Sequence, residues 1–536
     1  MTPEERLKIF RTAGTDVPPY EIAEIKSARI QKRDAQAGHR IKIRAFGEDI
    51  EHYLTPLDDV LVTNSTRIQE IRTIKNGNPG DYKVEDSNTT IDMIRDYIYE
   101  EKSRGITIAI KNNNGSREMS GIIGYKNLQV SPMPSHLRKS LDLNRSSRSV
   151  DDEIDSEYDE KLYHIIHKLP SIDDQNLTAP LFRVQRSYSN EQESEDSDHS
   201  IAYPEILVIV DHGLFKIMNF DMTDMVVYVI AFWNGVDMLY RDFDDPKIRL
   251  NIAAIAVAQD SKALDYIKPD NSGLNADRTL EEKGKWLFES SKNVNKFQTW
   301  SYDASLTMIG SYKLGRIINE KFSPKVGGIA NLGEICRTID NSSEVTKCGI
   351  FNDVGNYQAI RAAAHELGHI LGSKHDGDPE VARECSSELG AIMASSNSDN
   401  DESPYSHSFS ECSKAQIRRN LREESANCVW TKPKGSNTKP LPRILPGKLI
   451  SAEAQCPAKR GYPIPVKDES MCRILICKNL TGNRIISIDK PAADGTSCAE
   501  NKVCLHGHCV EEGEVLSYYA CKVNNNTEEC NRLKYW

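Results

Sequence analysis

Residues 362–377, AAAHELGHILGSKHDG, place three histidines and a glutamate within eleven positions of a 536-residue chain that has 13 histidines. The stretch Tyr357 to Leu371 has no proline and one glycine, and its Ala, Leu, Ile and Gln favour a helix. Residues four apart lie on one face of a helix, so His365 and His369 point the same way. Two imidazoles one turn apart suit zinc, which takes nitrogen ligands at about 2.0–2.1 Å.

A third ligand follows the predicted helix. Gly372 can adopt the left-handed conformation that ends a helix, which lets the chain turn back and present His375. Glu366 follows the first histidine and is rotated by about 100° around the helix axis, so it borders the site without joining it. Three protein ligands with one open position describe a catalytic zinc site, whereas a structural site is closed by four.

The length of the motif indicates whether it marks a zinc site or occurs by chance. HExxH is short and arises by chance, but HExxHxxGxxH also requires the glycine and the third histidine, and is far more specific. Met393 follows His375 by 18 residues. A methionine by itself is more often core filler.

The stretch HELGHILGSKHD resembles the reprolysin (adamalysin) branch of the metzincins, the ADAM and ADAMTS group, for which Asp376 directly after the third histidine is typical. The resemblance implies an α/β fold: a metzincin catalytic domain with a mixed twisted sheet and helices, a β-rich propeptide before it and a small disulfide-rich module after it. It makes Met393 the Met-turn residue beneath the zinc. It also implies that Glu366 takes a proton from the attacking water and passes it to the leaving amine.

Length and similarity predict five segments. The stretches AFGEDIEHYLTPLDDVLV and MSGIIGYKNLQVSPMP resemble a reprolysin propeptide, and ADGTSCAENKVCLHGHCV resembles the cysteine-rich module of the ADAMTS group. Many relatives silence their zinc with a propeptide cysteine, but residues 1–186 contain none. The predicted segments are the propeptide (1–186), an acidic linker (187–199), the zinc metalloproteinase domain (200–432), a second linker (433–445) and the disintegrin-like, cysteine-rich module (446–536).

Apolar patterning predicts the elements around the site. Propeptide strands are plausible at His39–Phe46 and Gly105–Lys111. In the catalytic domain we expect strands at PEILVIVD and Ile248–Ala258, and helices at Met222–Arg241 and Thr279–Lys292. By resemblance, GGIANLGEIC is an edge strand that binds substrate through main-chain hydrogen bonds. A plain glycine-rich loop remains the alternative for that stretch.

Cysteine usage indicates an oxidising compartment. Eight of the 13 cysteines follow residue 455 at close spacing, the pattern of a disulfide-stapled module. The start, MTPEERLKIF, has no apolar signal-peptide region. We therefore expect a secreted protein whose printed start lacks its leader, with a non-standard export route as the alternative. Eight sequons agree with secretion: Asn64, Asn88, Asn114, Asn144, Asn176, Asn341, Asn479 and Asn525.

Processing is expected at Arg183-Val184-Gln185-Arg186, an RxxR site of the kind that furin-like proteases read. It lies just before the acidic stretch SNEQESEDSDHS, which should be exposed. Arg145 to Arg148 is a second RxxR and the alternative cut. The first site predicts that the mature enzyme begins at Ser187.

The resemblance also implies disulfides and a second metal site. Cys336 should pair with Cys428, and Cys385 with Cys412, which leaves Cys348 a free thiol; a Cys336–Cys348 bridge is the competing arrangement. Family positions that bind calcium match Glu205 and Asp303, near Cys428. The family usually adds a carboxylate or amide where this chain has Thr431, so structural calcium and plain solvated carboxylates both stay open. For the CLHGHC stretch, disulfides are favoured over a second zinc.

Charge and hydropathy restrict the partners. The net charge of −11 argues against a nucleic-acid partner. Apolar runs such as Met225 to Trp233 are shorter than the roughly 18 residues that span a bilayer, so we expect no transmembrane anchor. The expected protein is a secreted, monomeric zinc endopeptidase acting on extracellular proteins. Two alternatives remain: an inactive protease that serves as a binding module, and a protein that binds cells or matrix mainly through its cysteine-rich module.

Overall fold

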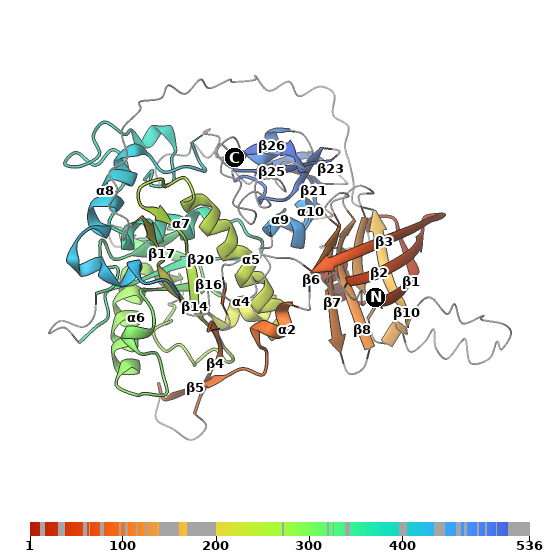
Figure 1. Ribbon diagram of the computed structural model, residues 1–536, viewed down its shortest axis with the longest axis horizontal. Coiled ribbons are helices and arrows are strands. Elements are labelled where there is room, and N and C mark those ends of the chain that lie inside the picture. Colours follow the sequence, from red (N-terminus) through yellow and green to blue (C-terminus); the bar gives the residue numbers. More distant parts are fainter. Residues whose placement is uncertain are drawn as a thin grey trace. The chain divides into compact units, whose positions relative to one another are not determined.

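The chain forms two compact units in the computed structural model (Figure 1). One consists of residues 1–59, 92–172 and 441–536, and the other of residues 60–91 and 173–440. The structure describes residues 1–10, 17–30, 38–56, 62–63, 65–74, 80–95, 98–101, 106–113, 116–123, 126, 128–134, 136–138, 160–168, 200–270, 273–318, 321–324, 326–337, 343–395, 405–433, 445–456, 463–465, 469–479, 482–487, 490–499 and 501–512.

The first unit contains a closed eight-stranded barrel in the order β1-β10-β9-β8-β7-β6-β3-β2. Alternate residues such as Ile41, Ile43 and Ile166 fill its interior. The β-rich N-terminal region is therefore confirmed, and the two strands predicted there occur within two residues of the expected bounds. The elements are α1 (Pro3–Phe10), α2 (Ile91–Arg95), β1 (Tyr20–Ile30), β2 (Gly38–Ala45), β3 (Glu48–Pro56), β6 (Ile98–Glu101), β7 (Ile106–Asn113), β8 (Ser116–Ile123), β9 (Leu128–Pro132) and β10 (Glu160–Lys168).

The same unit contains the disulfide-rich C-terminal module, whose core is largely cystine. Three bridges are formed in its described part: Cys456–Cys477, Cys472–Cys504 and Cys498–Cys509. The cysteines that flank His506 and His508 are thus bonded to other cysteines, which agrees with disulfides and not zinc. The elements are α9 (Pro446–Leu449), α10 (Ala452–Gln455), η6 (Glu469–Cys472), β21 (Pro463–Pro465), β22 (Ile476–Asn479), β23 (Gly482–Ser487), β24 (Ser497–Ala499), β25 (Lys502–Leu505) and β26 (His508–Glu511).

The second unit is built on a mixed seven-stranded sheet in the order β19-β20-β16-β12-β14-β4-β5. The central strands run parallel, and the terminal strands β19 and β5 are antiparallel to their neighbours. The strands of the main sheet are β4 (Arg67–Thr73), β5 (Tyr82–Asp86), β12 (Glu205–Val210), β14 (Asn251–Ala258), β16 (Ala304–Ile309), β19 (Gly328–Ala330) and β20 (Cys348–Asn352); the short strands are β11 (Ile201–Ala202), β13 (Lys247–Ile248), β15 (Leu274–Asn275), β17 (Leu314–Ile318) and β18 (Lys321–Ser323).

Helices complete this unit, and the expected α/β fold class is confirmed. Strands such as β12 and β16 are buried along nearly their whole length, as expected for parallel strands covered on both faces. The helices are α4 (His212–Ile217), α5 (Met222–Tyr240), α6 (Ala276–Ser291), α7 (Ile360–Ile370), α8 (Glu411–Leu421), η3 (Thr299–Ser301), η4 (Ser387–Leu389) and η5 (Glu424–Trp430).

Helix α5 is the central helix of this unit. Asp221 caps its N-terminus by accepting from the Asp224 amide, and residues 225–240 are all buried. By length and hydropathy alone the helix would be long enough to cross a membrane, but 83% of its most apolar window is buried inside the protein. Its apolar character is accounted for by its place in the core.

Some predicted elements differ from the observed ones. The helix expected at Thr279–Lys292 is α6, which begins three residues earlier, at Ala276. The strand expected at Ile248–Ala258 is divided into β13 and β14, because the Leu250 amide donates to Asp237 Oδ1 (2.7 Å) instead of joining a ladder. The helix expected from Tyr357 begins at Ile360, since Tyr357 has a φ of 64°, outside the helical region.

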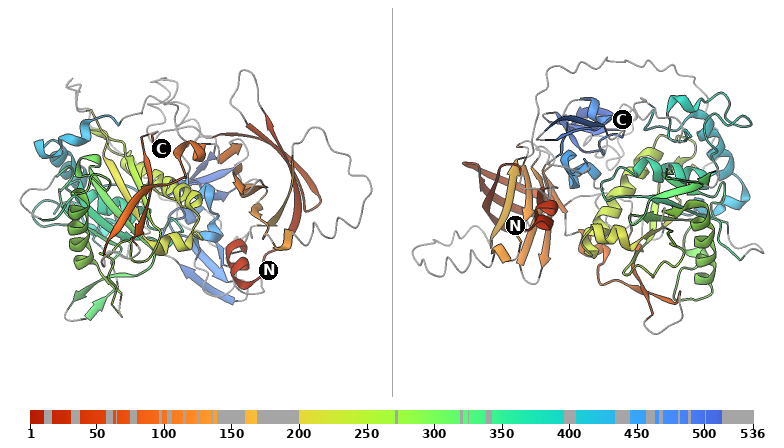
Figure 2. Two further views of the ribbon diagram at one scale, coloured as in Figure 1. Left: turned by 90° about the horizontal axis from the view of Figure 1, so that it is seen from below. Right: turned by 180° about the vertical axis from the view of Figure 1, so that it is seen from behind.

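Part of the predicted propeptide, residues 60–91, belongs to the second compact unit. Strands β4 and β5 lie within the predicted propeptide, yet β4 pairs with β14 of the seven-stranded sheet, as Figure 1 shows and Figure 2 shows again from behind. The N-terminal segment is thus shared between the barrel and the seven-stranded sheet.

Candidate active site

The three histidines of the motif converge on one point. His365 and His369 lie one turn apart on α7, and His375 comes from the loop that follows. Their Nε2 atoms are separated by 3.1 Å (His365 to His369), 3.1 Å (His365 to His375) and 3.2 Å (His369 to His375). The spacing on the helix and the turn after it therefore bring all three side chains together.

The turn that returns the chain depends on Gly372, which has a φ of 108°. Its amide donates to the His369 carbonyl, and the Ser373 amide reaches back to Gly368 O (both 2.9 Å), which closes the end of α7. A side chain at this position would also meet Asn420, whose Cβ lies 2.5 Å from an added Cβ.

Hydrogen bonds set the tautomers of the two helical histidines. His365 Nδ1 lies 2.7 Å from Ile392 O, and His369 Nδ1 lies 2.7 Å from Ser373 O. A carbonyl accepts, so each Nδ1 carries the proton and each Nε2 keeps its lone pair. Burial lowers the pKa of all three motif histidines, to about 4 for His369, which keeps the rings neutral.

This arrangement fits zinc. Three lone pairs that face one another at 3.1–3.2 Å repel unless a cation lies between them, and tetrahedral ligands at about 2.0–2.1 Å from zinc stand about 3.3–3.4 Å apart. Ring orientation by a carbonyl on the opposite nitrogen is typical of zinc-binding histidines. The three residues could therefore hold a metal ion through neutral nitrogen donors.

Glu366 is 4% exposed, and its Oε2 has no hydrogen-bond partner among the described residues. Burial raises its pKa to about 8, an effect that the positive charge of Arg316 opposes. Gly328 of β19 lies directly against it: a Cβ on Gly328 would come within 2.6 Å of Glu366 Cγ. An unpartnered buried carboxyl beside the histidines is the arrangement expected of a general base.

The predicted Met-turn residue, Met393, is fully buried beneath α7. Its Sδ lies 2.6 Å from where a Cβ of Gly368 would be, so the glycine inside the motif allows the methionine to approach the helix. The neighbouring Ile392 carbonyl orients His365, and Met393 O accepts from the Asp376 amide at 2.9 Å. The turn thus links the first and third ligands.

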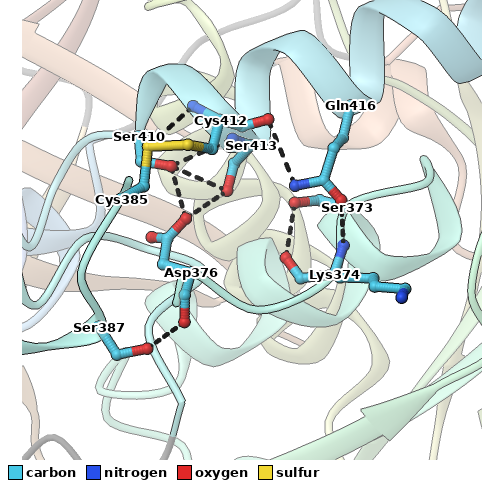
Figure 3. Close-up of a disulfide and its surroundings, with 9 residues drawn as sticks. All are labelled: Ser373, Lys374, Asp376, Cys385, Ser387, Ser410, Cys412, Ser413 and Gln416. Carbon is cyan, nitrogen blue, oxygen red and sulfur yellow. Dashed lines mark hydrogen bonds between the residues drawn. A yellow bond between two sulfur atoms is a disulfide. The ribbon is translucent and has the colours of Figure 1, made fainter. Parts of the chain in front are cut away.

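Sequence reasoning missed the residues that hold the His375 loop (Figure 3). Asp376 Oδ1 accepts from Ser410 Oγ (2.5 Å) and Ser413 Oγ (2.8 Å), and the Asp376 carbonyl accepts from Ser387 Oγ. Gln416 Oε1 accepts from the Lys374 amide at 3.0 Å. Ser410 caps the N-terminus of α8, and Ser413 and Gln416 lie on that helix. No spacing rule connects these three residues to the motif.

Two disulfides brace this domain. The structure joins Cys336 to Cys428, and Cys385 to Cys412 beside Asp376. Cys348 is free and fully buried in β20, where burial raises the pKa of its thiol to about 11. An inert thiol is expected there.

The residues proposed for calcium are close in space. Asp303 Oδ2 accepts from the Glu205 amide at 2.9 Å, and burial raises the Asp303 pKa to about 7. Asp303 clusters with the sulfurs of Cys336 and Cys428, but these are joined in a disulfide, and calcium takes oxygen ligands. Calcium at this position stays a prediction.

The remaining site predictions have less structural support. Asn88 is exposed and Asn479 lies in β22. The others lie outside the described residues: Arg183, Arg186, Asn64, Asn114, Asn144, Asn176, Asn341 and Asn525.

Comparison with known proteins agrees with the geometry. Residues 204–410 match the family described as "Metallo-peptidase family M12", and residues 446–510 match "ADAMTS cysteine-rich domain 2". The chain is 25% identical over 520 residues to "A disintegrin and metalloproteinase with thrombospondin motifs like" from Bombyx mori, covering 89% of this chain and 73% of that protein.

Two further relatives are matched over shorter stretches. "Venom metalloproteinase 3" from Eulophus pennicornis is 30% identical over 37% of this chain and 45% of its own length. "A disintegrin and metalloproteinase with thrombospondin motifs 1" from Rattus norvegicus is 33% identical over 37% of this chain and 20% of its own length. The chain thus spans less than half of each of these two relatives. Together the matches support a metalloprotease.

Proposed function

Because the chain carries a metallopeptidase domain of family M12 followed by an ADAMTS cysteine-rich domain, we propose that it is a zinc-dependent endopeptidase that cleaves extracellular proteins. The observation that carries this proposal is the convergence of three histidine Nε2 atoms within 3.2 Å of one another, beside the buried Glu366. In this proposal His365, His369 and His375 hold the zinc.

The chain's own residues would handle the protons. When bound, zinc supplies a Lewis acid that lowers the pKa of water and polarises the scissile carbonyl. Glu366 accepts the proton of the attacking water and delivers it to the leaving nitrogen, which needs no covalent enzyme intermediate. The carbonyls of Ile392 and Ser373 keep the ligand rings in position.

The substrate would bind along β19. This strand ends the sheet, is partly exposed, and pairs with β20 on one side. An extended peptide can add to such an edge through main-chain hydrogen bonds. Gly328 in β19 lies against Glu366, so a peptide on this edge would pass the general base.

Secretion and maturation belong to the same proposal. Five described disulfides support an oxidising compartment. We expect a furin-like protease to cut after Arg186, a structural calcium at Glu205 and Asp303, and a monomeric enzyme. The alternative of a protein that acts mainly by binding is not favoured, because every residue of the hydrolytic site is present.

A chelation experiment tests the function. Purified secreted protein is incubated with a peptide library, and cleavage products are identified by mass spectrometry. We expect internal cleavage that a zinc chelator abolishes and that stoichiometric zinc restores. Cleavage that persists after zinc has been removed to below one tenth of an equivalent, as measured by elemental analysis, would contradict the proposal.

A further inference from the structure

The hairpin formed by β4 and β5 extends the catalytic sheet at the edge opposite β19 (Figure 1). Arg67 to Ile71 pair in parallel with Ala254 to Ala258. The partners are separated by 187 residues, with the predicted processing site between them. A segment expected to be cut from the enzyme is therefore part of the enzyme's sheet.

Side-chain hydrogen bonds hold both ends of β4. At its start, Thr66 Oγ1 donates to Ile252 O at 2.7 Å. At its end, the Thr73 amide and Oγ1 donate to the two carboxylate oxygens of Asp260, at 2.8 and 2.5 Å. Between them the Gln259 amide donates to Ile71 O at 2.9 Å. These contacts fix one register, because a shift by one residue would break both ends.

Apolar contacts also hold the hairpin against the rest of the domain. Ile71 is fully buried and Tyr82 is 6% exposed, and both belong to the cluster that contains Leu207 and Trp286. The Tyr82 ring stacks on Trp286 with centroids 4.6 Å apart, and Lys296 lies over its other face at 3.5 Å. The hairpin thus contributes to the core of the catalytic domain and does more than lie on its surface.

The hairpin also changes the character of the sheet edge. Strand β14, NIAAIAVA, has no charged residue and no proline, and left at an edge it would be a template for aggregation. Strand β5, YKVED, presents Lys83, Glu85 and Asp86 at the new edge, all exposed. Charged residues on an edge strand oppose pairing with another chain.

From these contacts we infer that β4 and β5 are a strand-donating hairpin that stays bound to the catalytic domain after the chain is cut at residue 186. The mature enzyme is then a non-covalent complex of two chains, with the β14 edge covered and the opposite, β19 edge left for substrate. The inference rests on the proposed processing step, but its readout is fragment association and does not depend on peptidase activity.

The test begins with the full chain, which is cut after Arg186 by a furin-type protease. If that bond is not cleaved, the recognition sequence of a different protease is introduced at residues 183–186 and that protease is used. The cut protein is passed over a sizing column without denaturant. We expect the fragments 1–186 and 187–536 to elute together and to separate in 6 M urea. Separation of the wild-type fragments without denaturant would overturn the inference.

Matched variants assign the association to the hairpin. Ile71→Asp and Tyr82→Ala should each raise the separated fraction at least tenfold. The controls Ile22→Asp and Tyr53→Ala alter exposed residues of the barrel strands β1 and β3, and should behave as wild type. Co-elution of the Ile71→Asp fragments to the wild-type extent would show that other contacts hold the chains together.

Hydrogen exchange on the wild type covers the case in which a variant fails to fold. Peptides that span residues 251–260 should exchange equally slowly before and after the cut, because β4 still covers β14. Exchange more than tenfold faster after the cut would mean that the hairpin has left the edge, and would overturn the inference.

Discussion

Helix α7 and strand β10 both contain closely spaced histidines, and they use them in opposite ways. On α7, His365 and His369 are four apart and their Nε2 atoms meet His375 at 3.1 and 3.2 Å. On β10, His164 and His167 are three apart and point to opposite faces of the strand: His164 shares a face with Ile166 of the barrel core, and His167 packs against Phe10 at 5.2 Å.

The spacing of histidines in the sequence therefore indicates a metal site only when the secondary structure that carries them is known. On α7 each Nδ1 donates to a carbonyl, which leaves Nε2 free for a metal. In the barrel, His164 Nε2 already accepts from the Met119 amide at 2.8 Å, and His167 Nδ1 has no hydrogen-bond partner among the described residues. The α7 pair can therefore bind a metal ion, whereas the β10 pair is buried in the barrel.

The largest expected effect comes from breaking the helical set. His369→Ala removes one of three ligands, so we expect zinc content and peptide hydrolysis both to be lost. His164→Gln keeps an acceptor for the Met119 amide and should leave zinc content unchanged. Elemental analysis after gel filtration measures both. Equal zinc loss in the two variants would contradict the assignment of zinc binding to α7 and not to β10.

Glu366→Ala tests whether Glu366 acts as the general base without being a zinc ligand. We expect hydrolysis to fall by about 10²–10⁴-fold, the range for loss of a general base, while zinc content stays at the wild-type level. The exposed Glu380 provides a control, since Glu380→Ala should keep activity. Substantial turnover by a contaminant-free Glu366→Ala preparation would show that another group takes the proton.

The barrel histidines predict a pH dependence of stability. Burial lowers the pKa of His164 to about 3, with a contribution from Arg138, and that of His167 to about 4. Both pKa values lie below the unfolded value of about 6.5, so acid favours the unfolded barrel. The stabilisation is complete above pH 6.5 and is lost as the pH falls towards 4, by about 2 kcal/mol for each histidine between pH 7 and 5.

Urea unfolding followed by circular dichroism at both pH values tests this. The double variant His164→Gln, His167→Phe should lose less stability between pH 7 and 5 than the wild type, because Gln still accepts and Phe packs on Phe10 without titrating. An unchanged dependence in the double variant would assign it to other groups.

Gly368→Ala tests the contact between α7 and the Met-turn. The added Cβ would lie 2.6 Å from Met393 Sδ, so we expect a loss of about 1–3 kcal/mol in the free energy of unfolding from overpacking. Gly327→Ala is the control, since its Cβ would meet Ala362 Cβ at an ordinary 3.8 Å. Calorimetry of both variants measures the difference. Equal melting temperatures would mean that the Met-turn shifts to accommodate the added methyl group without loss of stability.

The smallest effect is expected from Ser413→Ala, which removes one of two hydroxyl donors to Asp376 Oδ1. We expect a loss of about 1 kcal/mol in stability, because Ser410 remains. Ser408→Ala, whose hydroxyl donates to Tyr405 O at 3.2 Å on the surface, is the comparison. No difference between the two in urea unfolding would show that Ser410 alone holds the loop.

Local sequence determined the cluster of three histidines in this protein. The i, i+4 pair, the glycine at φ 108° and the third histidine depend on helix geometry and a turn, which are set within eleven residues. The same holds for the α/β class and the β-rich N-terminal region, since apolar runs and alternation are properties of short segments.

Tertiary structure alone decided what surrounds the ligands and where the N-terminal segment goes. Ile392 O lies 27 residues from His365, Ser413 lies 37 from Asp376, and β4 pairs with β14 across 187 residues. Such contacts depend on which distant segments the folding chain brings together, and any of several apolar strands could pair with β14. No local pattern encodes that choice, because the register of a strand pair is set by the packing of both partners against the shared core.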